Sequence, residues 1–132
     1  MPISPDINIA TRDSFLATVD DKFVALVTEI DATITGVSMD LEAYISYKML
    51  MYRVGKKRSD WLIAIDVRGT KCVTLRFFKG IHLSDPDKLL RLGTTTIGNL
   101  DFTTTLTESD KAHIATFTEQ SIAWHAHEAS QK

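Results

Sequence analysis

The sequence predicts an α+β fold, a two-layer sandwich in which an antiparallel sheet of four to five strands carries an N-terminal and a C-terminal helix on one face. Apolar residues recur with helical spacing over 16–34 and alternate with a period of two over 45–105, and a second helical pattern follows Thr107. Helices at the two ends of a run of strands are typical of this class. Because the chain has 132 residues, of which 44% are apolar and 24% charged, we expect one domain over residues 11–128.

The first helix shows the clearest pattern. Seven apolar residues fall on one stripe at 100° per residue: Leu16, Val19, Phe23, Leu26, Val27, Ile30 and Ile34. Thr11 could cap this helix, or Asp20 could cap a second helix after a break near Val19. Gly36 is expected to end it. Residues 1–10 are expected to form a flexible lead-in, and residues 129–132 are expected to fray.

Alternating apolar residues predict four strands, at about 49–54, 61–68, 72–78 and 97–103. The alternation also assigns the two faces of the sheet. The residues expected to face the helices are Leu50, Tyr52, Ile63, Ile65, Val73, Leu75, Phe77, Leu100 and Phe102. The residues expected to face the other way are Met51, Arg53, Leu62, Asp66, Thr74, Arg76, Asn99 and Asp101.

Two further helices are predicted from capping patterns. Ser84, followed by Asp-Pro, predicts a short helix that ends near Gly93. Thr107, followed by acidic residues, predicts the C-terminal helix, which is expected to run to about His127.

The histidines near the C-terminus do not predict a simple metal chelate. On a helix, His125 and His127 point about 200° apart, so they cannot share an ion there. His125 with Glu128 could share one, and a frayed end would also allow both histidines. The preferred interpretation is a helix C-terminus at which the histidines interact with the helix dipole.

Charge is unevenly distributed along the chain, although the net charge is only -2. Residues 1–47 hold two basic and eight acidic residues, whereas residues 48–91 hold eleven basic and four acidic residues. Residues 92–132 hold two basic and five acidic residues. The predicted helices are therefore acidic and the predicted sheet is basic, an asymmetry that favours charged partners on opposite sides.

The acidic helices raise the hypothesis of a metal site. Asp13, Asp20 and Asp31 lie within about 20° of each other on one flank of the apolar stripe, and Asp21 lies further round. At 1.5 Å per residue, Asp20 and Asp31 are about 16 Å apart on a continuous helix, so they cannot chelate one ion. They could hold several hard cations weakly, with water completing each shell. The alternative is a solvated helix face.

The basic sheet raises a second hypothesis, a surface for phosphates or another anionic partner. Its basic residues are Lys56, Lys57, Arg58, Lys71 and Lys79. Cross-strand pairing could instead neutralise this face, through Arg53, Asp66, Arg76 and Asp101. No aromatic residue is expected between the basic ones, so a platform for stacked bases is missing. Nucleic acid is therefore not the expected partner, and self-association as a homodimer is an open alternative.

Other signatures indicate what kind of protein to expect. The sequence has no Gly-x-Ser-x-Gly, no His-Glu-x-x-His and no glycine-rich phosphate loop, so nothing in it supports an enzyme. The longest apolar run, 62–65, is far shorter than the roughly 20 residues of a membrane span. The N-terminus lacks the features of a signal peptide, and Cys72 is the single cysteine. These observations favour a cytoplasmic protein.

Two segments resemble the YdhG-like family of small bacterial domains of unknown function. The first looks like the family's signature segment and comprises Phe77-Phe78-Lys79-Gly80, Ser84-Asp85-Pro86, Leu89-Leu90 and Gly93. The second, Ile45-Ser46-Tyr47-Lys48-Met49, resembles its upstream motif. There, Lys48 stands where glycine is usual and Leu50 stands where proline is usual. The resemblance covers roughly residues 20–122.

The resemblance implies two helices packed on an antiparallel sheet, in agreement with the pattern of the strands and helices. Some members are described as frataxin-like iron chaperones, which hold iron on an acidic helix. The resemblance therefore implies weakly bound iron at Asp13, Asp20, Asp21 and Asp31. The expected function is a non-enzymatic binding domain that handles iron, and the alternative is an interaction or self-association module that uses the basic sheet face.

Overall fold

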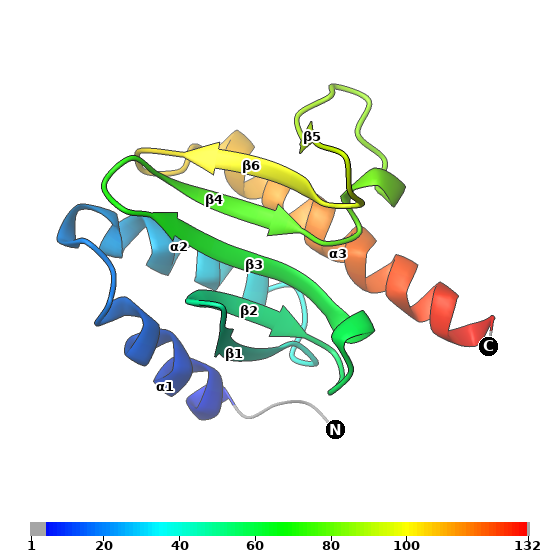
Figure 1. Ribbon diagram of the computed structural model, residues 1–132, viewed down its shortest axis with the longest axis horizontal. Coiled ribbons are helices and arrows are strands. Elements are labelled where there is room, and N and C mark those ends of the chain that lie inside the picture. The colour runs from blue at the N-terminus through cyan, green and yellow to red at the C-terminus, as the bar shows by residue number, and fades with distance from the viewer. Residues whose placement is uncertain (1–4, 132) are drawn as a thin grey trace.

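One open antiparallel sheet forms the framework of the molecule (Figure 1). The computed structural model describes residues 5–131. The strands in this part of the chain are β1 (Glu42–Ser46), β2 (Met49–Arg53), β3 (Trp61–Arg68), β4 (Cys72–Phe77), β5 (Arg91–Leu92) and β6 (Gly98–Phe102). They lie in the order β1-β2-β3-β4-β6-β5. The helices are α1 (Pro5–Leu16), α2 (Val24–Thr35) and α3 (Glu108–Ser130).

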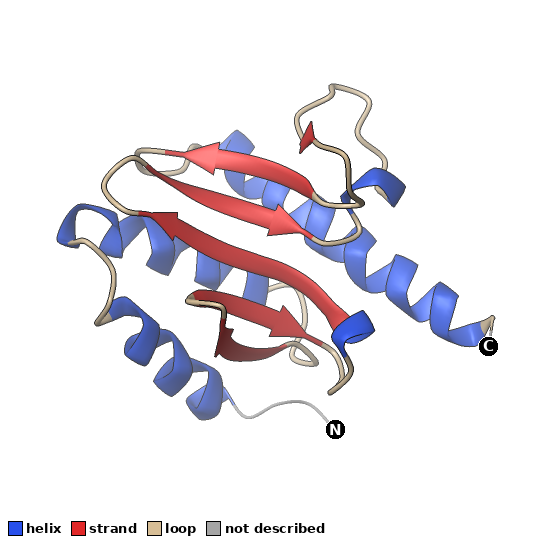
Figure 2. Ribbon diagram, in the orientation of Figure 1, coloured by secondary structure: helices blue, strands red, loops and turns tan. Residues whose placement is uncertain are grey.

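Helices α2 and α3 lie against one face of the sheet and leave the other face open, and α1 packs beside the edge strand β1 (Figure 2). The α+β class predicted from the sequence is thus confirmed, with six strands in place of four to five. Strand β1 was not predicted because its buried residue, Ala43, is small and gives a weak apolar alternation. Strand β5 has two residues, too few to show any period.

The core lies between the sheet and the helices, as the alternation predicts. Seven of the residues predicted to face the helices are fully buried: Leu50, Tyr52, Ile63, Ile65, Val73, Leu75 and Phe77. They pack with apolar residues of α2 and α3 such as Ile30, Ile34 and Ile114. Leu100 and Phe102 are partly buried against the same core.

The N-terminal helical segment is broken, as the second alternative from the sequence proposes. Helix α1 ends at Leu16, and a short 3-10 turn, Asp21–Phe23, precedes α2. The Asp20 side chain caps this turn by accepting a hydrogen bond from the backbone N–H of Lys22 at 3.0 Å. Helix α1 begins at Pro5, so the prediction of a flexible lead-in over residues 1–10 is wrong for residues 5–10. Residues 1–4 lie outside the described part of the chain.

The predicted helix from Ser84 to Gly93 does not form. The Asp85 carboxylate accepts hydrogen bonds from the backbone N–H groups of Leu89 and Leu90, at 2.8 and 2.9 Å. In a helix those two groups would donate to backbone carbonyls, so the Asp85 side chain competes with helix formation. Lys88 adopts a left-handed conformation with φ 53°, which also stops a helix.

Helix α3 begins as predicted and runs further than predicted. Thr107 and Asp110 form a capping box, in which each side chain accepts a hydrogen bond from the other residue's backbone N–H. The helix continues to Ser130, past the predicted end near His127 and into the segment expected to fray. Within residues 5–131, no helix combines the length and the apolar character needed to span a bilayer.

Candidate functional site

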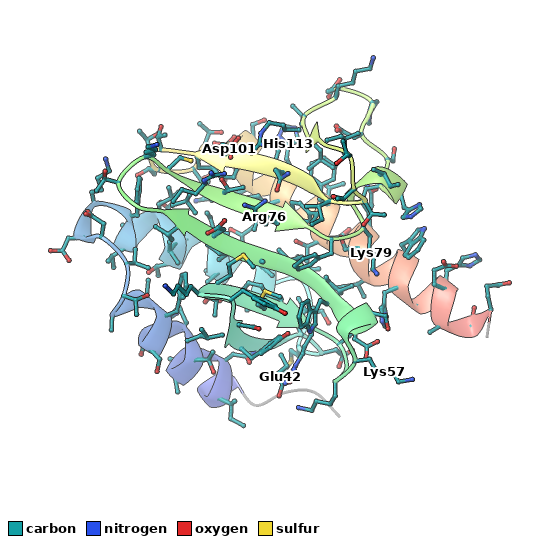
Figure 3. The ribbon with its side chains drawn as sticks, in the orientation of Figure 1. Glu42, Lys57, Arg76, Lys79, Asp101 and His113 are labelled. Carbon is teal, nitrogen blue, oxygen red and sulfur yellow. The ribbon has the colours of Figure 1, made fainter. Side chains whose placement is uncertain are left out.

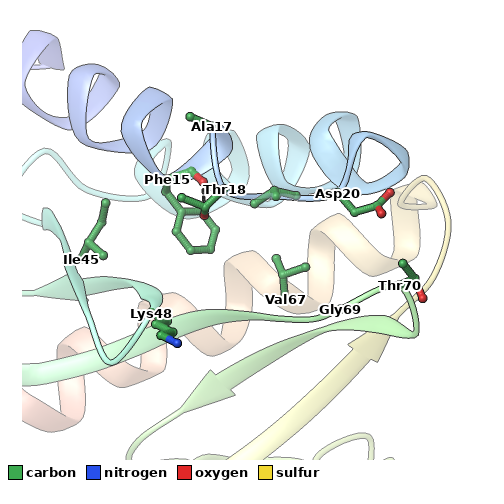
Figure 4. A pocket seen from close by; sticks show the side chains of 10 residues that line it. Phe15, Ala17, Thr18, Asp20, Ile45, Lys48, Val67, Gly69 and Thr70 are labelled. Atoms are coloured by element: carbon green, nitrogen blue, oxygen red, sulfur yellow. Dashed lines mark hydrogen bonds between the residues drawn. The ribbon is translucent and has the colours of Figure 1, made fainter.

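A groove of about 760 Å³ opens where the end of α1 meets the sheet (Figure 4). We call it the α1 groove. Its lining residues are Phe15, Ala17, Thr18, Val19, Asp20, Ile45, Lys48, Val67, Gly69 and Thr70. They come from the end of α1 and the following loop, from the hairpin β1–β2 and from the hairpin β3–β4. Its volume lies within the range of small-molecule sites, roughly 300–1,000 Å³.

The break after α1 forms the helical wall of the groove. The chain leaves the helix at Leu16, and the Thr18 hydroxyl donates to the carbonyl of Phe15 at 2.7 Å. Phe15 and Val19 are buried at the base of this wall, while Thr18 and Asp20 are exposed at its rim. Because the helix ends at Leu16, the non-helical residues 17–20 line the groove.

The sheet wall of the groove is also apolar. Ile45 of β1 is 45% exposed, and Val67 of β3, which also lines the groove, is partly buried. The hairpin β3–β4 closes this wall through Gly69, whose φ of 60° is a conformation that glycine adopts without strain. An apolar ligand would therefore remove both walls from water.

The hairpin β1–β2 has a strained turn. Tyr47 and Lys48 link the paired residues Ser46 and Met49, and their φ angles are 52° and 62°. Two-residue hairpin turns with positive φ at both central positions favour asparagine and glycine. Neither residue is of that kind here, and each left-handed residue costs roughly 1–2 kcal/mol.

Two charged side chains, Lys48 and Asp20, stand at the rim of the α1 groove, on opposite walls (Figure 4). One oxygen of the Asp20 carboxylate is occupied by the backbone N–H of Lys22. Within residues 5–131, the Lys48 ammonium has no ion pair and no hydrogen bond. The groove therefore combines apolar walls with one cation that the described chain does not neutralise.

The acidic residues predicted as metal ligands have separate environments. Asp31 is 5% exposed, and its carboxylate accepts a 2.6 Å hydrogen bond from the Tyr52 hydroxyl. The other Asp31 oxygen lies 3.6 Å from the Arg12 guanidinium. Burial raises the pKa of Asp31, and the contacts with Tyr52 and Arg12 oppose part of that rise. Asp31 therefore belongs to a polar network inside the core.

The other three acidic residues lie nearer the surface. Asp13 pairs with Arg12 at 3.1 Å, Asp20 caps the turn before α2, and Asp21 is exposed. Across the described residues, no group of three or more His, Cys, Asp or Glu side chains is arranged to hold a metal ion. The hypothesis of several weakly held cations does not require such a group, and it stays a prediction.

Basic residues on the open face of the sheet are partly paired. Arg76 donates to Asp66 at 2.7 Å and to Asn99 at 3.1 Å, and Arg91 pairs with Asp101 at 3.0 Å. The hydrogen bond from Arg91 is the main cause that lowers the pKa of Asp101. Figure 3 shows Arg76 and Asp101 on this uncovered face. Cross-strand pairing thus neutralises Arg76 and Arg91, and Lys56 pairs with Glu42 at 3.0 Å. Within the described residues, Lys57, Lys71 and Lys79 of the predicted basic surface make no ion pair.

An aromatic cluster also lies on the open face, and the Arg53 guanidinium stacks 3.8 Å over the ring of Tyr44. The expectation that no aromatic residue stands among the basic ones is therefore wrong. We define the cluster by Tyr44, Tyr47, Trp61 and Phe78. The ring of Trp61 lies 6.0–6.1 Å from each of the other three. Sequence reasoning missed it because Tyr44 lies on the unpredicted strand β1, and because a register shift between β2 and β3 pairs Trp61 with Arg53.

His125 has a tertiary partner that its place near a helix end does not reveal. Its Nε2 atom lies 2.8 Å from the Asp60 carboxylate, which joins α3 to the loop before β3. This hydrogen bond is the main cause that lowers the pKa of Asp60. Lys57 and Lys79 line the same hollow of about 350 Å³. Asp60 lies 65 residues from His125 in the chain, so no local pattern could have predicted the pair.

These features define an α+β domain with an apolar groove at one end and an open sheet face on which Arg76 and Arg91 are paired. Comparisons with protein-family models, with curated proteins and with solved structures find no match to the chain. The resemblance to the YdhG-like family therefore stays a prediction of the sequence.

Proposed function

We propose that this protein is a non-enzymatic binding domain that holds a small, largely apolar molecule in the α1 groove. The observation that carries the proposal is the half-exposed Ile45, which lines a groove of about 760 Å³ together with Phe15 of the helical wall and Val67 of the sheet wall. An apolar ligand there would bury side-chain surface that is now wet, at roughly 25 cal/mol per Å². The YdhG-like resemblance supports the same class of protein, a small binding domain.

A titration followed by amide NMR tests this proposal, with decanoate and 1-decanol as probes. We expect saturable shifts centred on the groove, at residues such as Val67 and Thr70. Ile45→Ser should weaken binding about fivefold, because roughly 1 kcal/mol of apolar burial is lost. Ile81→Ser is the matched control, since Ile81 is similarly exposed, at 49%, and does not line the groove. Shifts scattered over the surface, or no saturation with either probe, would contradict the proposal.

Iron handling is a separate part of the proposal and rests on the resemblance alone. The exposed carboxylates of Asp20 and Asp21 are the groups most available to a hard cation. Calorimetric titration with ferrous iron should then give saturable heat that an Asp20→Asn/Asp21→Asn variant loses. Absence of saturable heat in the wild-type protein would remove iron from the proposed function.

A second candidate function is an interaction module that uses the open sheet face for an anionic partner. The aromatic cluster favours it, because Tyr47 is 66% exposed beside Trp61. A gel-shift assay with a single-stranded oligonucleotide tests it, since counterion release predicts steep weakening as salt rises. Tyr47→Ser should weaken a genuine complex, and an undetectable shift at low salt rejects this candidate.

A further inference from the structure

We infer that the ligand of the α1 groove carries an anionic group, which the Lys48 ammonium binds at the rim. The ligand class is thus an amphipathic anion with an apolar body and a carboxylate or a similar group at one end. This inference rests on the proposed function, because it concerns the same groove.

The first argument is the backbone at Lys48. Lys48 has a φ of 62°, a conformation that glycine adopts freely and that strains a residue with a side chain. Tyr47, its strained neighbour, gains an edge-on contact between its ring and that of Trp61, at 6.0 Å. Lys48 makes no comparable stabilising contact, since its ammonium makes no ion pair or hydrogen bond within residues 5–131. Strain at a residue that lines a groove points to a role toward a ligand.

The second argument is the sign of the charge. The rim of the groove offers one cation and one anion, Lys48 and Asp20. Asp20 already accepts a backbone hydrogen bond as the cap of the turn Asp21–Phe23, whereas Lys48 is unpaired within the described part of the chain. A ligand anion would therefore meet a free partner, and a charge-assisted hydrogen bond beside apolar walls is stronger than one in open water.

The experiment compares two lysines with the same backbone conformation. Lys88 is exposed, has a φ of 53° and lies outside the α1 groove. Lys48→Gly and Lys88→Gly should each raise Tm by about 4 °C, because each removes left-handed strain. Lys48→Gly alone should weaken decanoate binding, by about fivefold or more. Lys48→Gln keeps the strain and removes the charge, so it should weaken decanoate binding without the rise in Tm.

Two further probes separate this inference from the proposed function. Decanol has the same apolar chain without the charge, and decyltrimethylammonium carries the opposite charge. We expect wild-type protein to bind decanoate more tightly than either, and Lys48→Gln to abolish that preference. Equal binding of decanoate and decanol, or decanoate binding unchanged in both Lys48 variants, overturns the inference while the groove remains a ligand site. Failure of all three probes to shift groove resonances overturns the proposed function as well.

Discussion

The two faces of the sheet are stabilised in different ways, although the same strands form both. On the face covered by helices, residues such as Leu75 and Ile65 are fully buried and apolar. On the open face, Arg76 lies between Asp66 and Asn99, and its charge is satisfied by neighbouring strands. The comparison shows that alternation assigns a residue to a face, whereas the energy at each face depends on partners far away in sequence.

The largest effect should come from the covered face. Leu75→Ala removes a fully buried side chain between the sheet and the helices, so we expect a loss of about 3 kcal/mol in the free energy of unfolding. Urea unfolding measures it. Leu92→Ala is the control, because Leu92 is 53% exposed and its truncation should change stability by less than about 0.5 kcal/mol. Similar losses in the two variants would contradict the assignment of the core.

The next effect tests the polar network of Arg12, Asp31 and Tyr52, which joins α1, α2 and β2. Tyr52→Phe removes the hydrogen bond to the buried Asp31 carboxylate, so we expect a loss of about 2 kcal/mol at neutral pH. In the Asp31→Asn background, Tyr52→Phe should lower the free energy of unfolding by less, because no buried charge is left unpaired. Equal losses in both backgrounds would show that the hydrogen bond contributes little.

The same network makes the stability of the protein depend on pH. Because the folded-state pKa of Asp31 lies above its unfolded value of 3.8, its contribution to stability is complete below that value. It is lost as pH rises through the folded pKa. Tyr52→Phe should extend this loss to higher pH, since the Tyr52 hydrogen bond lowers the pKa of Asp31. Urea midpoints measured from about pH 4 to pH 8 check the direction.

A smaller effect belongs to the open face. Arg76→Ala breaks the contacts with Asp66 and Asn99, which are partly buried, so we expect a loss of about 1 kcal/mol that shrinks with added salt. Arg68→Ala is the control, because Arg68 is exposed and makes no ion pair within the described chain. A loss as large as that of Leu75→Ala would erase the distinction between the two faces.

The smallest effect concerns the pair at the end of α3. The folded-state pKa of Asp60 lies below its ordinary value of 3.8, so its contribution is present above that value and is lost as pH falls through the folded pKa. Asp60→Asn should therefore lower stability by less than about 1 kcal/mol near neutral pH and flatten the acid limb of the stability curve. Asp87→Asn, at an exposed site, should leave that limb unchanged.

The sequence predicts the sheet well where several residues repeat one pattern. Alternation over β4 places Val73, Leu75 and Phe77 in the core as predicted. Leu62 of β3 and Met51 of β2, both predicted to face away from the helices, are instead fully buried, and Leu62 belongs to the core cluster next to the register shift between β2 and β3. Prediction fails at Ser84, since the same capping residues also suit a turn in which the Asp85 side chain binds two backbone N–H groups. Strand β5 is too short to produce a signal.

The α1 groove was not predictable as a site, because its walls come from separate segments that only the folded sheet brings together. Asp31 shows the same limit, since helical geometry placed it on the flank of the apolar stripe but could not reveal the Tyr52 hydroxyl that meets it. The sequence does contain one indication of the strained turn at the groove. Lys48 stands where the motif that this segment resembles usually has glycine, and its φ in the structure is positive.

Asn8 of α1 has a consequence for how this protein can assemble. Its side-chain amide donates to the carbonyl of Leu41 at 2.9 Å and accepts from the N–H of Ala43 at 3.0 Å, along the outer side of β1. It thereby occupies two of the backbone groups through which a second molecule would extend the sheet at that margin, the Leu41 carbonyl and the Ala43 N–H. The opposite margin, β5, offers two residues. A second molecule that adds a strand beside β1 would therefore have to displace the Asn8 side chain from these two groups.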